Sequence, residues 1–317
     1  YWVTYPDLVR LAGGTPVIVD TTLGDGFCPT AAQLKAALTS RTKAVILNSP
    51  NNPTGAGIPE RVLRELMAVL EGTGVWVLSD EIYGKLVYGG FEHVSPASFN
   101  ADAKGRTIVF DGVAKAYAMT GWRLGLAAGP KLVIDAMLLL QQQRISCPTG
   151  IAQAAAAYAL EEPPEVQQAV ADMHAAFTKR RALMIDALKV IDGAKVHAPE
   201  GAFYCFCDVS TRLPGKHGGA LVPDDLDLST RLLAEAHVAV VPGTPFGAPG
   251  GFRVSYASSE ATLEKGIGRV AEWLHVGARI GGRGRGWRSN DRSPATAGGI
   301  DVMAIAHARM YLGKIVD

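Results

Sequence analysis

Lys115 is the residue of this chain whose position most favours chemistry. It lies in the run of residues 112–123, which follows the apolar residues 107–110 after one intervening residue, Asp111. Because such an apolar run is typical of a buried strand, we expect the lysine to leave a sheet in a tight loop bounded by glycine. Its amine can form a Schiff base with an aldehyde. Arg123, further along the same run, carries a planar set of donors that suits phosphate.

An aldehyde that also carries a phosphate is pyridoxal 5'-phosphate, so Lys115 and Arg123 together indicate a site for this cofactor. The alternative is an exposed loop lysine beside a surface arginine, which is where both residue types usually lie. The two residues alone do not separate these interpretations. The motifs upstream of them favour the first.

Two upstream motifs place polar residues after apolar runs of their own. Residues 43–47 lead to Asn52, and residues 75–78 lead to Asp80 and Tyr83. In a parallel α/β sheet, ligands bind outside the carboxyl ends of the strands. We therefore expect these side chains and Lys115 to meet in one crevice.

Five motifs in this order resemble those of the class I/II aminotransferases, which are fold-type I pyridoxal-phosphate enzymes, and most of all the bacterial aspartate aminotransferase branch. The motifs are residues 1–6 (YWVTYP), 51–55 (NNPTG), 79–83 (SDEIY), 112–123 (GVAKAYAMTGWR) and 251–257 (GFRVSYA). The resemblance extends from residue 1 to about residue 274. It implies an α/β fold, with a three-layer, mostly parallel sheet in a large domain and a smaller C-terminal α+β domain.

The resemblance also implies a role for each cofactor-binding residue. Lys115 carries the cofactor as a Schiff base, and Arg123 binds its phosphate. Asp80 keeps the pyridine nitrogen protonated, which makes the ring a better electron sink. Asn52 and Tyr83 donate hydrogen bonds to the 3'-oxygen. Lys115, Asp80 and Tyr83 are thus the expected catalytic residues.

Substrate recognition is expected from other residues. Arg253 matches the arginine that pairs with the substrate α-carboxylate in two parallel bonds. Trp2 and Asn52 are expected beside the substrate. Arg144 of the partner subunit is expected to pair with a side-chain carboxylate.

Each of these residues also has a structural interpretation. Asp80 could cap a helix, Asn52 could form a turn before proline, and Tyr83 and Trp2 could simply pack. Arg253 could form a surface ion pair, and Arg144 could lie at a helix C-terminus, where the helix dipole favours a cation.

Composition limits the other functional classes. A net charge of +1 over 317 residues gives no field of one sign for nucleic acid. The uncharged runs are shorter than the roughly twenty residues of a membrane span. Cys28, Cys147, Cys205 and Cys207 do not form a metal-binding pattern. We interpret them as reduced core cysteines of a cytoplasmic protein without a metal site.

The resemblance implies the domain organisation. Residues 1–165 are expected to form the cofactor-binding large domain, and residues 166–275 the small domain, beginning in a bridging helix. The apolar periodicity predicts helices over residues 58–70, 131–143, 151–160, 163–191 and 260–274, and small-domain strands are expected near 195–209, 238–241 and 253. Residues 276–317 are rich in Arg and Gly and are predicted to be a disordered tail. A short RNA-binding segment is the alternative for that tail.

The chain begins at Tyr1, where the resemblance implies an N-terminal arm and a glycine-rich phosphate loop before it. We therefore interpret the sequence as an N-terminally truncated fragment. The predicted function is transfer of an amino group from aspartate or a similar donor to a 2-oxo acid such as 2-oxoglutarate. It proceeds by a ping-pong mechanism in a homodimer. Two alternatives remain: a carbon-sulfur β-lyase with the same residues, and an inactive truncated or regulatory module.

Overall fold

The computed structural model describes residues 1–217 and 219–275, which form two compact units. The first contains Tyr1–Lys179 and His197–Tyr204, and the second contains Arg180–Val196 and the chain from Cys205 on. The domain boundary predicted between residues 165 and 166 falls near the beginning of α8 (Pro164–Lys189), inside the first unit. That division into two functional domains stays a prediction. The predicted tail, residues 276–317, lies outside the described residues.

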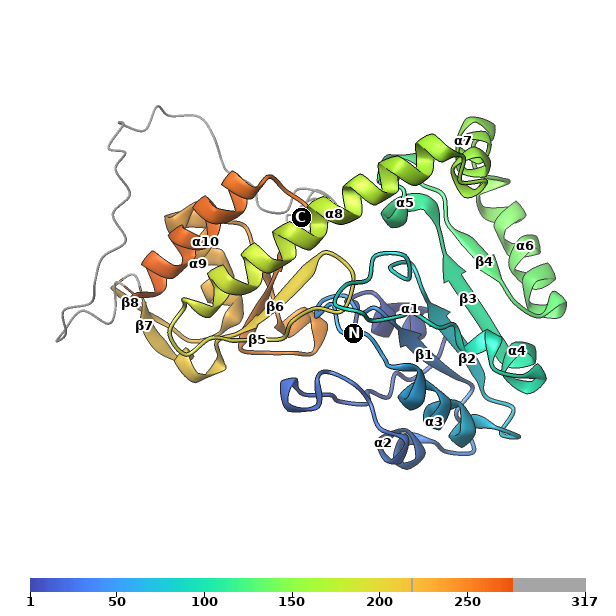
Figure 1. Cartoon of the computed structure of the whole chain (residues 1–317). Coiled ribbons are helices and arrows are strands. Elements are labelled where there is room, and N and C mark those ends of the chain that lie inside the picture. Colours follow the sequence, from blue (N-terminus) through green and yellow to red (C-terminus); the bar gives the residue numbers. More distant parts are fainter. Residues whose placement is uncertain (218, 276–317) are drawn as a thin grey trace. The chain divides into compact units, whose positions relative to one another are not determined.

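A four-stranded sheet organises the first unit (Figure 1). Its strands are, in spatial order, β1 (Ala44–Asn48), β2 (Trp76–Asp80), β3 (Thr107–Asp111) and β4 (Leu126–Ala128). β1, β2 and β3 are parallel, whereas β4 runs antiparallel to β3. Asn48 pairs with Asp80, and Asp80 pairs with Phe110, so the three parallel strands end at one level. The predicted α/β fold with a mostly parallel sheet is confirmed.

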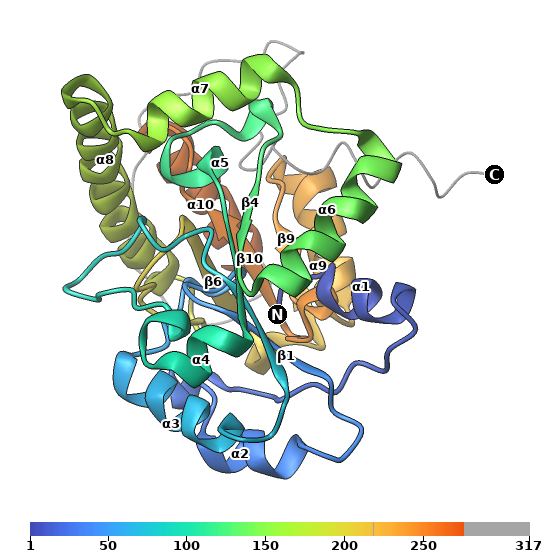
Figure 2. The ribbon, with the colours of Figure 1, turned by 90° about the vertical axis from the view of Figure 1, so that its right-hand side faces the viewer.

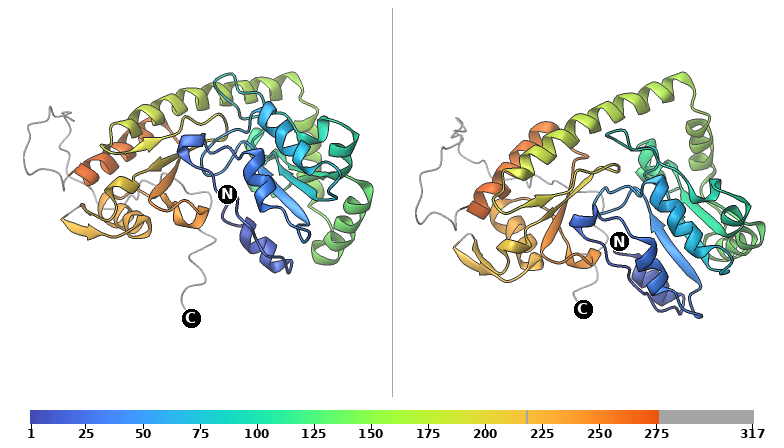
Figure 3. Two further views of the ribbon diagram at one scale, coloured as in Figure 1. Left: turned by 90° about the horizontal axis from the view of Figure 1, so that it is seen from below. Right: turned by 60° about the horizontal axis from the view of Figure 1, so that its bottom comes forward.

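Three helices pack on the sheet and hold it in place. They are α2 (Ala31–Ala37), α3 (Glu60–Leu70) and α4 (Ala101–Arg106), and α2 and α3 are the blue and light-blue helices of Figure 3. The buried side chains of α3 recur every three or four residues, which is the helical period. They pack against α2, α4, β1 and β2 in a core of Leu34, Leu47, Leu63, Leu66, Met67, Leu70, Val75, Val77 and Ala103.

The segment after β3 differs from the predicted loop. Residues Val113–Ala116 form one turn of helix, α5, so the expectation that Lys115 lies in a tight loop is wrong. Gly112 precedes this turn, and a Cβ atom there would lie 3.1 Å from the carbonyl oxygen of Leu124. The close approach of these two strand-end segments leaves little room for a longer loop. A 3₁₀ turn, η3 (Thr120–Trp122), follows before β4.

The predicted helices of the first unit are present, with one unusual feature. They are α6 (Lys131–Ile145), α7 (Gly150–Leu160) and α8, and a short helix, α1 (Tyr5–Leu11), precedes them in the chain. α7 packs on α5 through Ala152, Ala156 and Val113. α6, in contrast, which is labelled in Figure 2, has no buried residue. Its exposed large apolar side chains are Leu132, Leu138, Leu139, Leu140 and Ile145.

The second unit is α+β. One sheet has the order β5 (Lys195–Val196), β6 (Tyr204–Asp208), β10 (Gly251–Ser255) and β9 (Val241–Pro242). A second has β7 (Gly215–His217) and β8 (Ala220–Val222), and the helices are α9 (Asp225–Ala236) and α10 (Glu260–His275). The strand predicted over residues 238–241 is shorter than expected. The reason is that the Val238 N–H donates to the Leu232 carbonyl and continues the end of α9.

The cysteines correct part of the sequence interpretation. All four are free, and Cys205 and Cys207 are fully buried in β6, as the strand pattern predicts. Burial raises the pKa of the Cys205 thiol to about 12. Cys147, however, is exposed, and Cys28 is only half-buried. The assignment of Cys147 to the core is wrong, since no described part of the chain buries the segment after α6.

Neither a membrane-spanning helix nor a metal site is found in the described part of the chain. No described helix combines the length and apolar character needed to cross a membrane. No group of three or more His, Cys, Asp or Glu side chains there is placed to hold a metal ion.

The turn after β1 depends on a glycine. Gly55 has a φ of +72°, which disfavours residues with a Cβ atom, and its N–H donates to the Asn51 carbonyl at 2.8 Å. Its carbonyl accepts from the Gly201 N–H, also at 2.8 Å. A Cβ atom at this position would lie 2.4 Å from the Cβ of Pro199. Both the backbone conformation and the packing therefore require glycine here.

Replacement of Gly55 by alanine is expected to lower the free energy of unfolding by about 3 kcal/mol, from backbone strain plus overpacking. Gly72→Ala is the matched control, since Gly72 has a φ of +70° and a Cβ atom added there would meet nothing within 4 Å. The control isolates the backbone contribution, about 1 kcal/mol. Urea denaturation of both variants measures the difference, and equal losses would show that the contact with Pro199 is unimportant.

Candidate functional site

The carboxyl ends of β1, β2 and β3 are joined by hydrogen bonds between the segments that follow them. The Asp80 carbonyl accepts from the Asn48 side-chain amide at 3.2 Å and from the Ser49 N–H at 3.3 Å. The Glu81 N–H donates to the Phe110 carbonyl at 2.8 Å. The polar residues after these strands are thus held at one edge of the sheet, as the sequence predicted.

Asn52 lies in the turn after β1 and is 7% exposed. Its backbone N–H donates to Asn48 Oδ1 at 3.0 Å, which ties the turn back to the strand end. The turn-forming role considered for Asn52 is therefore present. By residue type, its side-chain amide is a neutral hydrogen-bond donor.

Asp80 is the last residue of β2, so the interpretation as a helix N-cap is wrong. Its Oδ1 accepts from the Ile82 N–H at 3.2 Å, and its Oδ2 accepts from the Tyr5 phenol. Burial raises the pKa of the Asp80 carboxyl above its ordinary value, while the hydrogen bonds and the charge of Lys115 act in the opposite direction. A half-buried carboxylate in this environment is suited to pair with a cation.

Lys115 is half-buried in α5, among aromatic rings. Its Nζ lies 5.9 Å from the ring centroid of Tyr83 and 5.5 Å from that of Phe203. Distances of this size allow a cation–π interaction with the ammonium form. Lys115 is thus a neighbour of Tyr83, and its positive charge also lowers the pKa of the Asp80 carboxyl in the same unit.

Tyr83 is 4% exposed, and its hydroxyl donates to the Tyr204 hydroxyl at 3.0 Å. Phe203 and Tyr204 were missed as site residues because their segment carries a strand pattern expected in the small domain. The aromatic pair following Gly201 is the signal that could have revealed them. Tyr83 therefore has the packing role considered for it and is also a neighbour of Lys115.

The remaining residues of the first unit lie nearer the surface. Arg123 is exposed, and its Nη1 donates to the Thr120 carbonyl at 3.0 Å, so the guanidinium turns back on its own loop. Trp2 is half-buried and packs edge to face on Tyr5, with ring centroids 5.5 Å apart. Arg144 is exposed in the last turn of α6, where the helix dipole favours a cation.

Arg253 belongs to the second unit. It is the central residue of β10 and pairs with Val241 of β9. Its guanidinium carbon lies 5.2 Å from the ring centroid of Phe246, and the residue is half-buried. A guanidinium held on a strand over an aromatic ring keeps a fixed direction, which suits bidentate recognition of a carboxylate.

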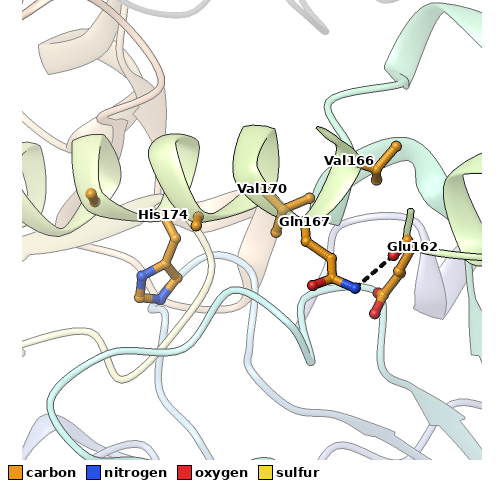
Figure 4. Close-up of a pocket in the computed structure, with 7 residues that line it drawn as sticks. Glu162, Val166, Gln167, Val170 and His174 are labelled. Carbon is orange, nitrogen blue, oxygen red and sulfur yellow. Dashed lines mark hydrogen bonds between the residues drawn. The ribbon is translucent and has the colours of Figure 1, made fainter. Parts of the chain in front are cut away.

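A separate cavity of about 550 Å³ lies along α8 (Figure 4). It is lined by Glu162 and by one face of the first half of that helix, and contains none of the residues discussed above. The Gln167 side-chain amide donates to the Glu162 carbonyl at 2.6 Å, and His174 Nε2 lies 2.6 Å from the Val87 carbonyl. These contacts hold α8 in place. Because none of the candidate site residues lines the cavity, we assign it no part in the chemistry.

The sheet and the side chains at its edge define the class of protein. The family model for aminotransferase class I and II matches residues 1–270, and the chain belongs to this family. The family uses pyridoxal 5'-phosphate.

Individual relatives are also similar. An aspartate aminotransferase of Rhizobium meliloti (strain 1021) is 44% identical over 274 residues, which cover 86% of this chain and 66% of that protein. One from Geobacillus stearothermophilus is 44% identical and covers 88% of this chain and 69% of its own length. Among solved structures, the aspartate aminotransferase of Rhizobium meliloti has a TM-score of 0.81 at 43% identity, covering 86% of this chain and 68% of that one. The chain thus spans about two thirds of the length of these relatives.

Proposed function

We propose that this chain carries the reaction centre of an aminotransferase. The enzyme would move the amino group of aspartate, or a similar L-amino acid, to a 2-oxo acid such as 2-oxoglutarate. The observation that carries this proposal is the meeting of Lys115, Tyr83 and Asp80 at the carboxyl edge of a parallel sheet. The names of the relatives, which are aspartate aminotransferases, support the choice of donor.

The donor set fits pyridoxal 5'-phosphate group by group. Lys115 offers an amine for the aldehyde, and Asp80 a carboxylate for the ring nitrogen. Asn52 and Tyr83 would be neutral donors for the 3'-oxygen, with the Tyr83 hydroxyl then accepting from Tyr204, and Arg123 would be a cation for the phosphate. When bound, the cofactor supplies a protonated ring that withdraws electrons from the substrate Cα.

In this proposal Lys115 is the general base. Its neutral Nζ accepts the Cα proton of the amino acid. It later donates a proton back in the step that leads to the 2-oxo acid product. The rings of Tyr83 and Phe203 lie beside Nζ and limit the positions that the side chain can take. The half-buried position of Lys115 thus helps to direct its amine.

Asp80 must be ionised to hold the ring N–H. Because burial raises its pKa, the carboxylate is lost at a higher pH than that of an exposed aspartate as the solution is acidified. Cofactor binding is therefore expected to weaken on the acid side at a pH above the ordinary aspartate range. Arg253 would pair with the substrate α-carboxylate, and Trp2 would contact the substrate.

Reduction of the chain with borohydride in the presence of pyridoxal 5'-phosphate, followed by peptide mapping, should place the label on Lys115. Lys115→Ala should lose the label and at least a thousandfold of the aspartate to 2-oxoglutarate activity, the scale of losing a general base and covalent anchor. Lys131→Ala is the control, since that side chain is exposed and paired with Asp135.

Labelling of Lys131 or Lys104 with Lys115 unmodified would contradict the assignment. Release of pyruvate from β-substituted donors without amino transfer would instead favour the β-lyase alternative. A chain that takes up no cofactor would favour the non-enzymatic alternative.

We also propose a homodimer formed in part through α6. Five large apolar side chains of this helix are 53–79% exposed, and helices with apolar residues on every side are normally buried. A second copy of the chain would cover them and bring Arg144 and the segment after it near the partner's site. The free thiols agree with a cytoplasmic location, which stays a prediction.

Light scattering at micromolar concentration should give a dimer mass for the native chain. Leu139→Glu should shift it towards the monomer by at least tenfold in dissociation constant, because a charge would be buried in the interface. Val190→Glu is the control, since Val190 is 69% exposed and lies outside α6. A native monomer that is fully active would remove the basis for any contribution across subunits.

Arg144 of the partner subunit is proposed to bind the distal carboxylate of the donor. The solved structure of the Thermus thermophilus aspartate aminotransferase with maleate shows that a relative takes a dicarboxylate. Arg144→Ala should therefore lower kcat/KM for aspartate by roughly a hundredfold and leave alanine nearly unchanged. Equal losses of kcat/KM for aspartate and alanine would show that Arg144 only stabilises the C-terminal end of α6.

A further inference from the structure

Tyr5 contacts Asp80 of the candidate site. The sequence motifs gave no role to Tyr5. It is the first residue of α1, and its phenol donates a hydrogen bond to Asp80 Oδ2 across a sequence separation of 75 residues. Burial, together with the charge of Asp80, raises the pKa of the Tyr5 phenol. The hydroxyl is therefore a neutral donor throughout the physiological range.

This contact is one of three that favour the ionised form of Asp80. Burial acts against the carboxylate form, and among the groups that oppose it the Tyr5 hydrogen bond has the largest effect on the Asp80 pKa, ahead of the Ile82 N–H and Lys115. A phenol that donates to a carboxylate also restricts rotation of the carboxyl group. The Ile82 N–H, at 3.2 Å, is a longer bond to the other oxygen.

Tyr5 also contacts Trp2. The two rings pack edge to face, with an interplanar angle of 81° and centroids 5.5 Å apart, a favourable geometry for aromatic pairs. One side chain thus touches both the carboxylate at the end of β2 and the indole that precedes α1. Movement of Tyr5 would disturb both at once.

We propose that Tyr5 is a positioning residue of the aminotransferase site, which holds the Asp80 carboxylate ionised and in a fixed plane and orients the Trp2 ring. The proposal concerns how the site is held and rests on the proposed function only for its catalytic consequence. The link between Tyr5 and Asp80 can be tested without cofactor.

The test is Tyr5→Phe, which removes the hydroxyl and keeps the ring that packs on Trp2. Tyr88→Phe is the matched control, because Tyr88 is also buried and donates its hydroxyl to a backbone carbonyl, that of Ala202, at 2.8 Å. In the cofactor-free chain labelled with [4-¹³C]aspartate, the Asp80 signal is identified by its loss in Asp80→Asn. Its titration in Tyr5→Phe should move to higher pH by about one unit, as expected for a lost hydrogen bond to a charged group.

With cofactor, Tyr5→Phe should lower kcat roughly tenfold to a hundredfold with little change in KM, since the affected group acts on the ring and not on the substrate. The acid limit of cofactor binding should move up in pH together with the Asp80 signal. In an Asp80→Asn background, adding Tyr5→Phe should cost less than twofold, because the two changes remove the same interaction.

An unchanged Asp80 titration in Tyr5→Phe would overturn the proposal, as would equal losses in Tyr5→Phe and Tyr88→Phe. A shifted titration in a chain that takes up no cofactor would keep the Tyr5–Asp80 link and reject the proposed function instead. The two proposals therefore fail in different measurements.

Discussion

The common level at which β1, β2 and β3 end is the constraint on which the candidate site depends. Asn48, Asp80 and Phe110 are paired across these strands, so the polar segments that follow start from one edge. A shift of one residue in β2 would turn the Asp80 side chain to the other face of the sheet. The apolar core beneath α3 opposes such a shift, because the same residues would have to leave it.

The balance of charge at Asp80 follows from this position. The end of a sheet strand is partly buried, and burial alone favours the protonated acid. A cofactor-binding carboxylate needs the ionised form, which is favoured by hydrogen bonds from α1 and the turn after β2 and by the positive charge of Lys115 in α5. These groups favour the ionised form of Asp80 although the side chain is partly buried. The site is therefore a set of compensating contacts and not a single strong one.

Family and fold class could be predicted from the sequence because ordered motifs and apolar periodicity are local properties. The helices α3, α6, α7, α8 and α10 lie within a few residues of their predicted bounds. Errors arose where a long-range contact decided the outcome. Lys115 lies in a helical turn, and Gly112 before that turn closely approaches Leu124. Cys147 is exposed, since no described part of the chain buries the segment after α6. The strand expected from residue 238 begins later, because the Val238 N–H donates to the Leu232 carbonyl at the end of α9.

The sequence by itself determined which chemical groups are present: an amine at Lys115, a carboxylate at Asp80 and guanidinium groups at Arg123 and Arg253. These follow from residue type and need no coordinates. Only the tertiary structure decided what surrounds them. The phenol of Tyr5 on Asp80 and the ring of Phe203 beside Lys115 come from residues 75 and 88 positions away, and no local pattern links them. These contacts result from tertiary packing, which brings together residues that are distant along the chain.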